Sequence, residues 1–261
     1  MPRYARKLSA NGIYHIMLRG NEKKEIFMDD EDRLRFLYTL QRMKSKVEYC
    51  IYAYCLMNNH IHLLLGEKTD KIQRSMKRIC VSYAYYFNYK YSRIGHLFQD
   101  RFKSENIDGD AYLTTCTRYI HNNPVKAGLV EMAGNYNWSS FQHYTGNECN
   151  RIVDVEIDLI LSMFSQDREK AVKIFEEYSH DLFDSEFIEY SDKAKKEKVK
   201  DLAGSINNIL KRNHTTLDEL KMITDKTCRN RIVKEIKETT SASTRDLARI
   251  TGLSKDLIFR A

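Results

Sequence analysis

Residues 56–67, Leu-Met-Asn-Asn-His-Ile-His-Leu-Leu-Leu-Gly-Glu, place two imidazoles one residue apart in an otherwise apolar run. The Asn-Asn pair predicts a tight turn after a preceding strand, residues 47–57, so the two segments form a β-hairpin. Because successive side chains of a strand point to opposite faces, His60 and His62 share one face and the alternating apolar residues share the other. The hairpin therefore predicts a sheet that buries one face and presents paired histidines on the other.

Two imidazoles on one strand face form a chelating arrangement. Such neighbours lie about 6.5–7 Å apart at Cα, close enough for two ring nitrogens to converge on one divalent ion. The alternative to metal binding is that both histidines are simply hydrogen-bonded or partly solvated. The pair alone does not distinguish these two roles, so the surrounding motifs are needed.

The flanking segments predict an α+β domain. Residues 12–19 are rich in β-branched and aromatic residues ahead of a Gly-Asn turn, which is typical of a strand. Helical spacing and capping signals predict further elements, namely a helix over 29–46, a helix over 70–92, a strand within 95–107, and a helix over 110–122 begun by Asp110 and ended by Pro124. This order is that of an antiparallel sheet with flanking helices, as in ferredoxin-like and RRM-like folds.

The +7 net charge of the 261-residue chain is unevenly distributed, which suggests three parts. Residues 1–150 hold 22 Lys or Arg against 15 Asp or Glu, residues 151–192 hold 4 against 12, and residues 193–261 hold 17 against 9. We interpret these parts as an α+β domain, an acidic helical connector and a basic all-α C-terminal extension. The two basic parts predict separate surfaces for a polyanion, although Lys-rich helices can also be simply solvated.

The C-terminal end has the spacing of a helix-turn-helix. Ala248 is followed by Gly252 four residues on and by Ile258 six further on, so that glycine allows the turn and apolar residues pack the two helices. Only about eight residues remain for a recognition helix, so a shortened unit or a small helical bundle are alternatives.

Composition also limits the compartment and the cofactors. No apolar run approaches the ~18 residues needed to span a bilayer, and the N-terminus lacks a signal-peptide apolar stretch. The six scattered cysteines form no CxxC pair and indicate reduced thiols, so we expect a cytoplasmic protein without a membrane partner. The chain contains no phosphate-cradling Gly-rich loop, so we expect no nucleotide cofactor.

A second group of residues shares one stripe of the helix predicted over 110–122. Tyr112, Cys116, Tyr119 and Asn123 fall at i, i+4, i+7 and i+11. A tyrosine beside a divalent metal can act as a nucleophile toward a phosphodiester, while the metal neutralises charge on the phosphate. Core packing is the alternative for any one of the seventeen tyrosines.

The motifs around this tyrosine carry a family resemblance. His60-Ile-His62 after the Asn-Asn turn is followed by Arg-Tyr-Ile-His-Asn-Asn-Pro-Val-Lys-Ala-Gly-Leu-Val over residues 118–130 and by Trp-Ser-Ser over residues 138–140. Over roughly residues 5–145, the chain resembles the single-tyrosine HUH transposases, specifically the REP-associated tyrosine transposase group.

The resemblance implies a role for each matching residue. His60 and His62 would bind Mg²⁺ or Mn²⁺, and Tyr119 would form a covalent 5′-phosphotyrosine on single-stranded DNA. Asn123 stands where related enzymes carry a third metal ligand, although its place before Pro124 puts it at the expected end of the helix.

The same resemblance implies DNA hairpins with single-stranded flanks as substrates. Candidate contacts to the DNA backbone are Arg19, Arg101, Lys103, Arg118 and Lys126, although each of them, taken alone, is more often a solvated surface charge. His121 could assist locally or simply bond to the backbone.

Two functional alternatives stay open at this stage. A catalytically silent hairpin-binding regulator would keep the fold without the chemistry, and a replication initiator or relaxase would share the chemistry. We expect a monomer, with a dimer that exchanges tyrosine helices as the alternative.

Overall fold

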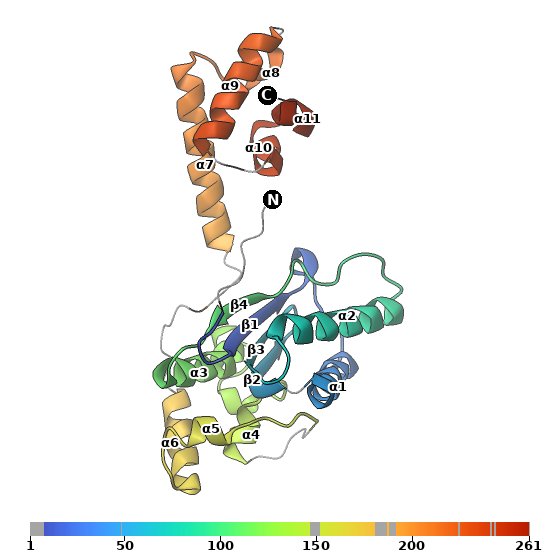
Figure 1. The fold of residues 1–261 in the computed structure, drawn as a ribbon, viewed down its shortest axis with the longest axis vertical. Helices are drawn as coiled ribbons and strands as arrows, with labels where there is room; N and C mark the ends of the chain where they lie inside the picture. Colours follow the sequence, from blue (N-terminus) through green and yellow to red (C-terminus); the bar gives the residue numbers. More distant parts are fainter. Residues whose placement is uncertain are drawn as a thin grey trace. The chain divides into compact units, whose positions relative to one another are not determined.

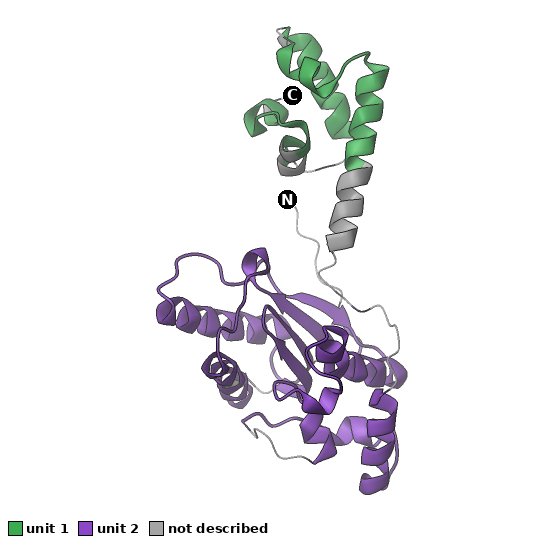
Figure 2. Cartoon of the chain, turned by 180° about the vertical axis from the view of Figure 1, so that it is seen from behind, with its two compact units in different colours: residues 1–4, 190–261 green, residues 5–189 purple. Residues whose placement is uncertain are grey.

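A computed structural model describes residues 8–47, 49–146, 152–180, 187, 192–223, 225–240, 242 and 244–260. The chain divides into two compact units (Figure 2), one of residues 5–189 and one of residues 190–261 together with residues 1–4, which lie outside the described part. Among the described helices, none is long and apolar enough to cross a membrane.

The first unit is built on a four-stranded antiparallel sheet of order β2-β3-β1-β4 (Figure 1). The strands are β1 (Ile13–Arg19), β2 (Tyr49–Met57), β3 (His60–Glu67) and β4 (Lys103–Asn106). One helix lies between β1 and β2 and another between β3 and β4 along the chain. This order is the split βαβ arrangement of ferredoxin-like folds, and it confirms the predicted α+β class.

Helices cover both faces of the sheet. In chain order they are η1 (Asn21–Lys23), α1 (Asp30–Val47), α2 (Ile72–Lys90), α3 (Asp110–Lys126), η2 (Ala133–Asn135), α4 (Phe141–Thr145), α5 (Asp158–Leu161) and α6 (Arg168–His180). Helices α1 and α2 pack together on one face of the sheet, and α3 packs on the other (Figure 1). Each face therefore has its own core, and the sheet separates them.

Strand alternation assigns the side chains of β1 and β3 to these two cores. Ile16 and Leu63 belong to the core under α1 and α2, together with the aromatic residues of those helices. His62 lies opposite Met17 in the register, and His60 lies opposite Arg19, so these residues face α3. The predicted division of the hairpin into an apolar face and a histidine face is confirmed.

Most predicted elements of this unit are confirmed to within a few residues. The strand predicted within 95–107 is shorter than that window, because it spans only the four residues Lys103–Asn106. The start of the strand predicted over 47–57 includes residue 48, which lies outside the described residues.

The end of α3 differs from the prediction. We expected Pro124 to stop the helix, but α3 continues through it to Lys126, so Asn123 lies inside the helix. An internal proline removes one hydrogen bond and costs about 3 kcal/mol. The buried side of α3 packs on β2, and Asn122 donates a hydrogen bond of 2.8 Å to the carbonyl of Ser179 on α6. These tertiary contacts hold the helix together where its local sequence would end it.

The Trp-Ser-Ser segment extends the edge of β2. The N–H of Leu56 donates to the carbonyl of Trp138, and the N–H of Ser140 donates to the carbonyl of Tyr54. In return, the N–H of Tyr54 donates to the Ser140 hydroxyl at 2.9 Å. This motif therefore ties the chain after α3 back to the sheet.

The acidic segment is more than a connector. Ile160 and Phe175 are fully buried and share a core with residues of α3 and α4. We predicted a separate segment over 151–192 because its charged residues dominate its composition, but its apolar residues pack within the unit of residues 5–189. The expected boundary at residue 150 lies outside the described residues.

The second unit is entirely helical. Its elements are α7 (Asp192–Arg212), α8 (Leu217–Met222), α9 (Lys226–Thr240), α10 (Thr244–Thr251) and α11 (Lys255–Arg260). Their apolar faces form one small core, which includes Ile206, Leu247 and Ile258. Gly252 joins α10 and α11 with a φ of +71°, a conformation that glycine adopts without strain. The predicted helix–turn–helix shape is present, while its role in DNA binding stays a prediction.

Candidate active site

The two histidines of β3 lie side by side at the start of the strand. Their ring centroids are 5.1 Å apart and the rings are nearly perpendicular, at 84°. The Nδ1 atom of His60 lies 2.7 Å from the amide oxygen of Asn59. The Nδ1 atom of His62 lies 3.0 Å from Nε2 of His15 on β1. Both Nδ1 atoms are thus engaged by neighbours, which leaves the two Nε2 atoms for a ligand.

Burial keeps both rings in the form that binds metal. Desolvation, and secondarily the nearby Arg19, lowers the pKa of His60 to about 4. Desolvation, with smaller contributions from His15 and His60, lowers the pKa of His62 well below its ordinary value. Neutral imidazole is the metal-binding species, so near pH 7 both rings can act as ligands.

The donor set suits a hard divalent cation only if oxygen atoms complete it. No group of three or more His, Cys, Asp or Glu side chains able to hold a metal occurs among the residues that the structure describes. Two imidazoles supplemented by an amide oxygen, water and phosphate oxygens would fit Mg²⁺ or Mn²⁺, which prefer oxygen ligands. The residues present therefore fit the ion that the sequence predicts.

Tyr119 lies beside His62 of this pair. It is carried by α3, and its ring centroid is 5.6 Å from that of His62 and 5.7 Å from that of His15. The side chain is buried, with 3% of its surface exposed, and the ring of Phe187 packs against it at 4.6 Å. The structure thus brings together the tyrosine and the histidines that the sequence proposed as one site.

Asn123 lies one helical turn beyond Tyr119. Its amide nitrogen donates a hydrogen bond of 2.8 Å to the carbonyl of Tyr119, and the residue is buried. This bond uses the nitrogen, so the amide oxygen is the atom that could serve as a ligand. Because α3 continues through Pro124, Asn123 sits on ordered helix.

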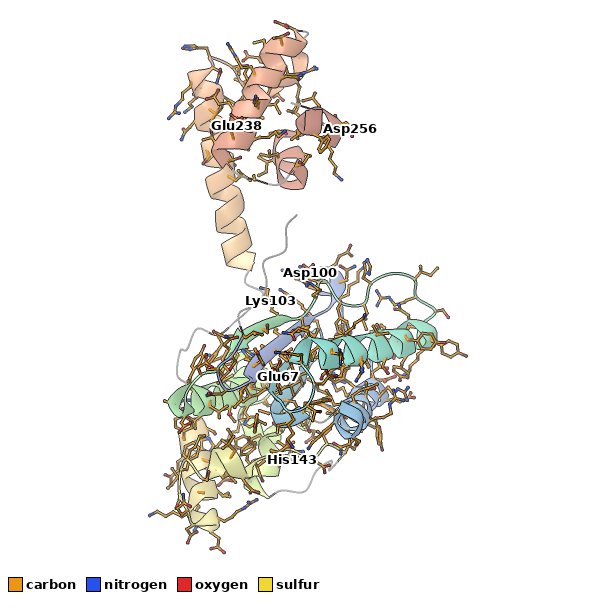
Figure 3. All side chains as sticks on the ribbon, in the orientation of Figure 1. Glu67, Asp100, Lys103, His143, Glu238 and Asp256 are labelled. Carbon is orange, nitrogen blue, oxygen red and sulfur yellow. The ribbon has the colours of Figure 1, made fainter. Side chains whose placement is uncertain are left out.

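The five predicted DNA contacts fall into different surroundings. Arg19 shares the face of His60, and Lys103 (Figure 3) begins β4 opposite Met17. The Nζ atom of Lys126 lies 5.2 Å from the centroid of the Tyr119 ring. Arg101 is exposed just before β4. These four cations remain candidates for contacts with a phosphate backbone.

Arg118 does not fit the predicted role. Its guanidinium stacks on the ring of Tyr178 at 4.0 Å and donates to the Tyr178 carbonyl at 3.3 Å. Only 9% of the residue is exposed, so Arg118 joins α3 to α6 instead of facing a ligand. The sequence suggested a DNA contact because charge alone does not reveal which arginines are buried.

His121 also has a structural environment. Its Nε2 atom lies 2.8 Å from the Ser140 hydroxyl, and the aromatic rings of Phe141, Tyr144 and Phe175 surround it. Burial lowers its pKa to about 3. The predicted hydrogen bond exists, but its partner is a side chain and not the backbone.

Sequence reasoning missed three residues around the site. His15 lies behind His62, Glu105 on β4 lies opposite His15, and Phe187 covers Tyr119. The alternation of side chains along β1 places His15 on the same face as Arg19, and this pattern could have identified His15 as a residue near the site. Phe187 comes from a distant segment that carries no local signal.

Comparison with known proteins finds similarity to transposases. Residues 9–123 match a family model described as "Transposase IS200 like". A Haemophilus influenzae protein assigned to the REP-associated tyrosine transposases is 28% identical over 160 residues, which span 54% of this chain and 86% of that protein. A solved structure titled as a REP-associated tyrosine transposase bound to a REP hairpin is 19% identical, covers 60% of this chain and 93% of that chain, and has a TM-score of 0.48.

The matched range contains His60, His62, Tyr119 and Asn123. Over the range that carries the site, the first unit is therefore similar to the IS200-like transposases.

Proposed function

We propose that this protein is a transposase and a metal-dependent transesterase of the single-tyrosine HUH type, which cuts and rejoins single-stranded DNA through Tyr119. The observation that carries the proposal is the placement of the Tyr119 ring 5.6 Å from His62, one of a histidine pair that burial keeps neutral. A tyrosine in such a place can act on a phosphate held by the same ion that the histidines bind.

Tyr119 and the proposed metal ligands would have different roles in this reaction. The Tyr119 oxygen would attack phosphorus, so that a new O–P ester forms, the bond to the 3′ oxygen breaks, and a free 3′-hydroxyl leaves with the phenol proton passing to solvent or to that oxygen. Mg²⁺ or Mn²⁺, held by His60, His62 and the Asn123 oxygen, would neutralise charge on the phosphate. The phosphotyrosine retains the energy of the diester, so rejoining requires no ATP.

The substrate would be DNA with a hairpin next to a single-stranded cleavage site. The match to REP-associated transposases supports this choice, and the cations Arg19, Lys103 and Lys126 lie on the face that carries the site. Contacts between such cations and phosphates fix the position of a strand without selecting its sequence.

The proposal also includes a cytoplasmic location and a monomeric state. The five described cysteines are unpaired thiols, which fits the cytoplasm. We propose a monomer, because Tyr119 reaches the histidines of its own chain.

The test is a covalent adduct assay with hairpin oligonucleotides that carry single-stranded flanks. Incubation with Mn²⁺ should give a protein–DNA species that survives denaturant, and Tyr119→Phe should abolish it. Tyr89→Phe is the matched control, because Tyr89 is an exposed tyrosine on α2, beyond the opposite face of the sheet. Binding of the hairpin without any adduct in the wild-type protein would support a silent regulator instead.

A further inference from the structure

A chain of polar side chains runs behind His62, away from the ligand position. The hydroxyl of Tyr112 donates to one carboxylate oxygen of Glu105 at 2.6 Å. The other oxygen of Glu105 lies 3.7 Å from Nδ1 of His15. Nε2 of His15 in turn lies 3.0 Å from Nδ1 of His62, and the two rings stack at 5.2 Å with 17° between their planes.

The sheet itself builds this chain. Glu105 on the short strand β4 is the register partner of His15 on β1. His62 on β3 pairs with Met17, which lies two residues from His15 on the same face of β1. His15 is buried, and its Nδ1 atom makes no hydrogen bond within the described part of the chain. A buried side chain held between a carboxylate and a proposed metal ligand needs an explanation beyond packing.

The contact between two neutral imidazoles allows only two arrangements of protons. In the first, Nδ1–H of His62 donates to His15, which leaves a lone pair on Nε2 of His62 and a proton on Nδ1 of His15. In the second, Nε2–H of His15 donates to His62, whose Nε2 must then carry a proton and cannot bind a metal. Only the first arrangement makes His62 a ligand.

Glu105 favours the first arrangement. A carboxylate attracts an N–H and repels a lone pair, so it is stabilised when Nδ1 of His15 carries the proton. The bond from Tyr112 holds the carboxylate in this position.

We propose that His15 and Glu105 are positioning residues that fix His62 in the tautomer whose Nε2 lone pair faces the metal. This inference rests on the proposed metal-dependent function. Partners behind a metal-binding histidine set its tautomer and ring orientation, and their loss typically weakens metal affinity about 10–100-fold.

The first experiment measures Mn²⁺ binding to the full chain without DNA by isothermal titration calorimetry. His15→Phe keeps a flat ring in the buried position but offers no acceptor, so its affinity should fall about 10–100-fold. His15→Gln can accept from His62 through its amide oxygen, so it should restore most of that affinity. The urea unfolding midpoints of the two variants check that any loss does not follow from unfolding.

The second experiment requires no metal. Two-bond ¹H–¹⁵N correlation spectra of the histidine side chains, assigned with His62→Ala and His15→Gln, should show the proton of His62 on Nδ1. Glu105→Gln should shift His62 toward the tautomer protonated on Nε2.

These measurements distinguish the positioning role of His15 from the metal site itself. Equal Mn²⁺ affinity in wild type and His15→Phe, or a wild-type His62 protonated on Nε2, would overturn the positioning role and leave the proposed function standing. A wild-type chain that binds no Mn²⁺ would overturn the metal site and this inference together.

Discussion

The two faces of the same sheet differ in what they bury. Under α1 and α2, the strands contribute side chains such as Ile16, Leu18 and Leu63, which are fully apolar. Under α3, the next residues of the same strands contribute His15 and His62. Adjacent residues of β1 and β3 thus face different surroundings, one the apolar core and the other the histidine site.

This difference shows what a small domain needs in order to bury polar groups. Burying an imidazole costs free energy unless hydrogen bonds satisfy it, so the α3 face depends on a network of partners. The α1 and α2 face depends mainly on apolar area, which is non-directional, and the hydroxyls of its buried Tyr49 and Tyr83 donate to backbone carbonyls. We therefore expect substitutions of the site histidines on the α3 face to change metal binding, and substitutions on the α1 and α2 face to change stability alone.

The largest effect on stability should come from the apolar face. Leu63→Ala removes a fully buried side chain from the core under α1 and α2, which should lower the free energy of unfolding by about 2–5 kcal/mol. Urea denaturation followed by circular dichroism measures the change. Mn²⁺ affinity of the folded fraction should stay within a few fold of wild type, and a parallel loss of affinity would show that the two faces are not separable.

The next effect should be confined to the histidine face. His62→Ala removes a proposed ligand, so the Mn²⁺ affinity of this variant should fall by more than about 100-fold. This loss is larger than the one expected for His15, which contacts the ligand but not the metal. Calorimetric titration measures it, with His96→Ala as the control, since His96 is exposed outside the site. Equal losses in both variants would contradict the assignment of the site.

A smaller effect should follow at the edge of β2. Ser140→Ala removes the acceptor for the N–H of Tyr54 and the partner of His121. Two buried groups lose a hydrogen bond, so the free energy of unfolding should fall by about 1–3 kcal/mol. Thermal and urea unfolding measure it, while a variant as stable as wild type would mean that water replaces the hydroxyl.

The last expected effect is a dependence of stability on pH. Burial lowers the pKa of His121 to about 3 from its ordinary 6.5, so the folded state favours the neutral ring. Its contribution to stability is complete above about pH 6.5 and is lost as the pH falls toward 3, by at most about 1.4 kcal/mol per pH unit.

Urea unfolding at pH 7, 6 and 5 tests this dependence. His121→Gln can still donate to Ser140 but does not titrate, so its stability should fall less steeply than that of the wild type. Parallel slopes for the two proteins would contradict the assigned burial effect.

Sequence patterns predicted the part of the architecture that depends on local spacing. The alternation around His60 and His62 gave their common face, and the helical stripe through Tyr119 and Asn123 gave one face of α3. Both follow from the periods of strands and helices.

Other features depend on contacts between distant segments. The pairing of His15 with Glu105 and His62 requires the registers of three strands, which no single segment encodes. The passage of α3 through Pro124 and the burial of Arg118 depend on packing against β2 and α6. Local rules fail at such places because tertiary packing outweighs propensity.

The most direct measurement of the central claim is mass spectrometry of the covalent adduct. After reaction with a hairpin oligonucleotide and Mn²⁺, digestion with protease and nuclease leaves a nucleotide on the attacking residue. We expect the modified peptide to carry the nucleotide on Tyr119. A nucleotide on Tyr112, the other tyrosine of α3 in this network, or a hairpin-bound, Mn²⁺-loaded protein without any modified peptide, would contradict it.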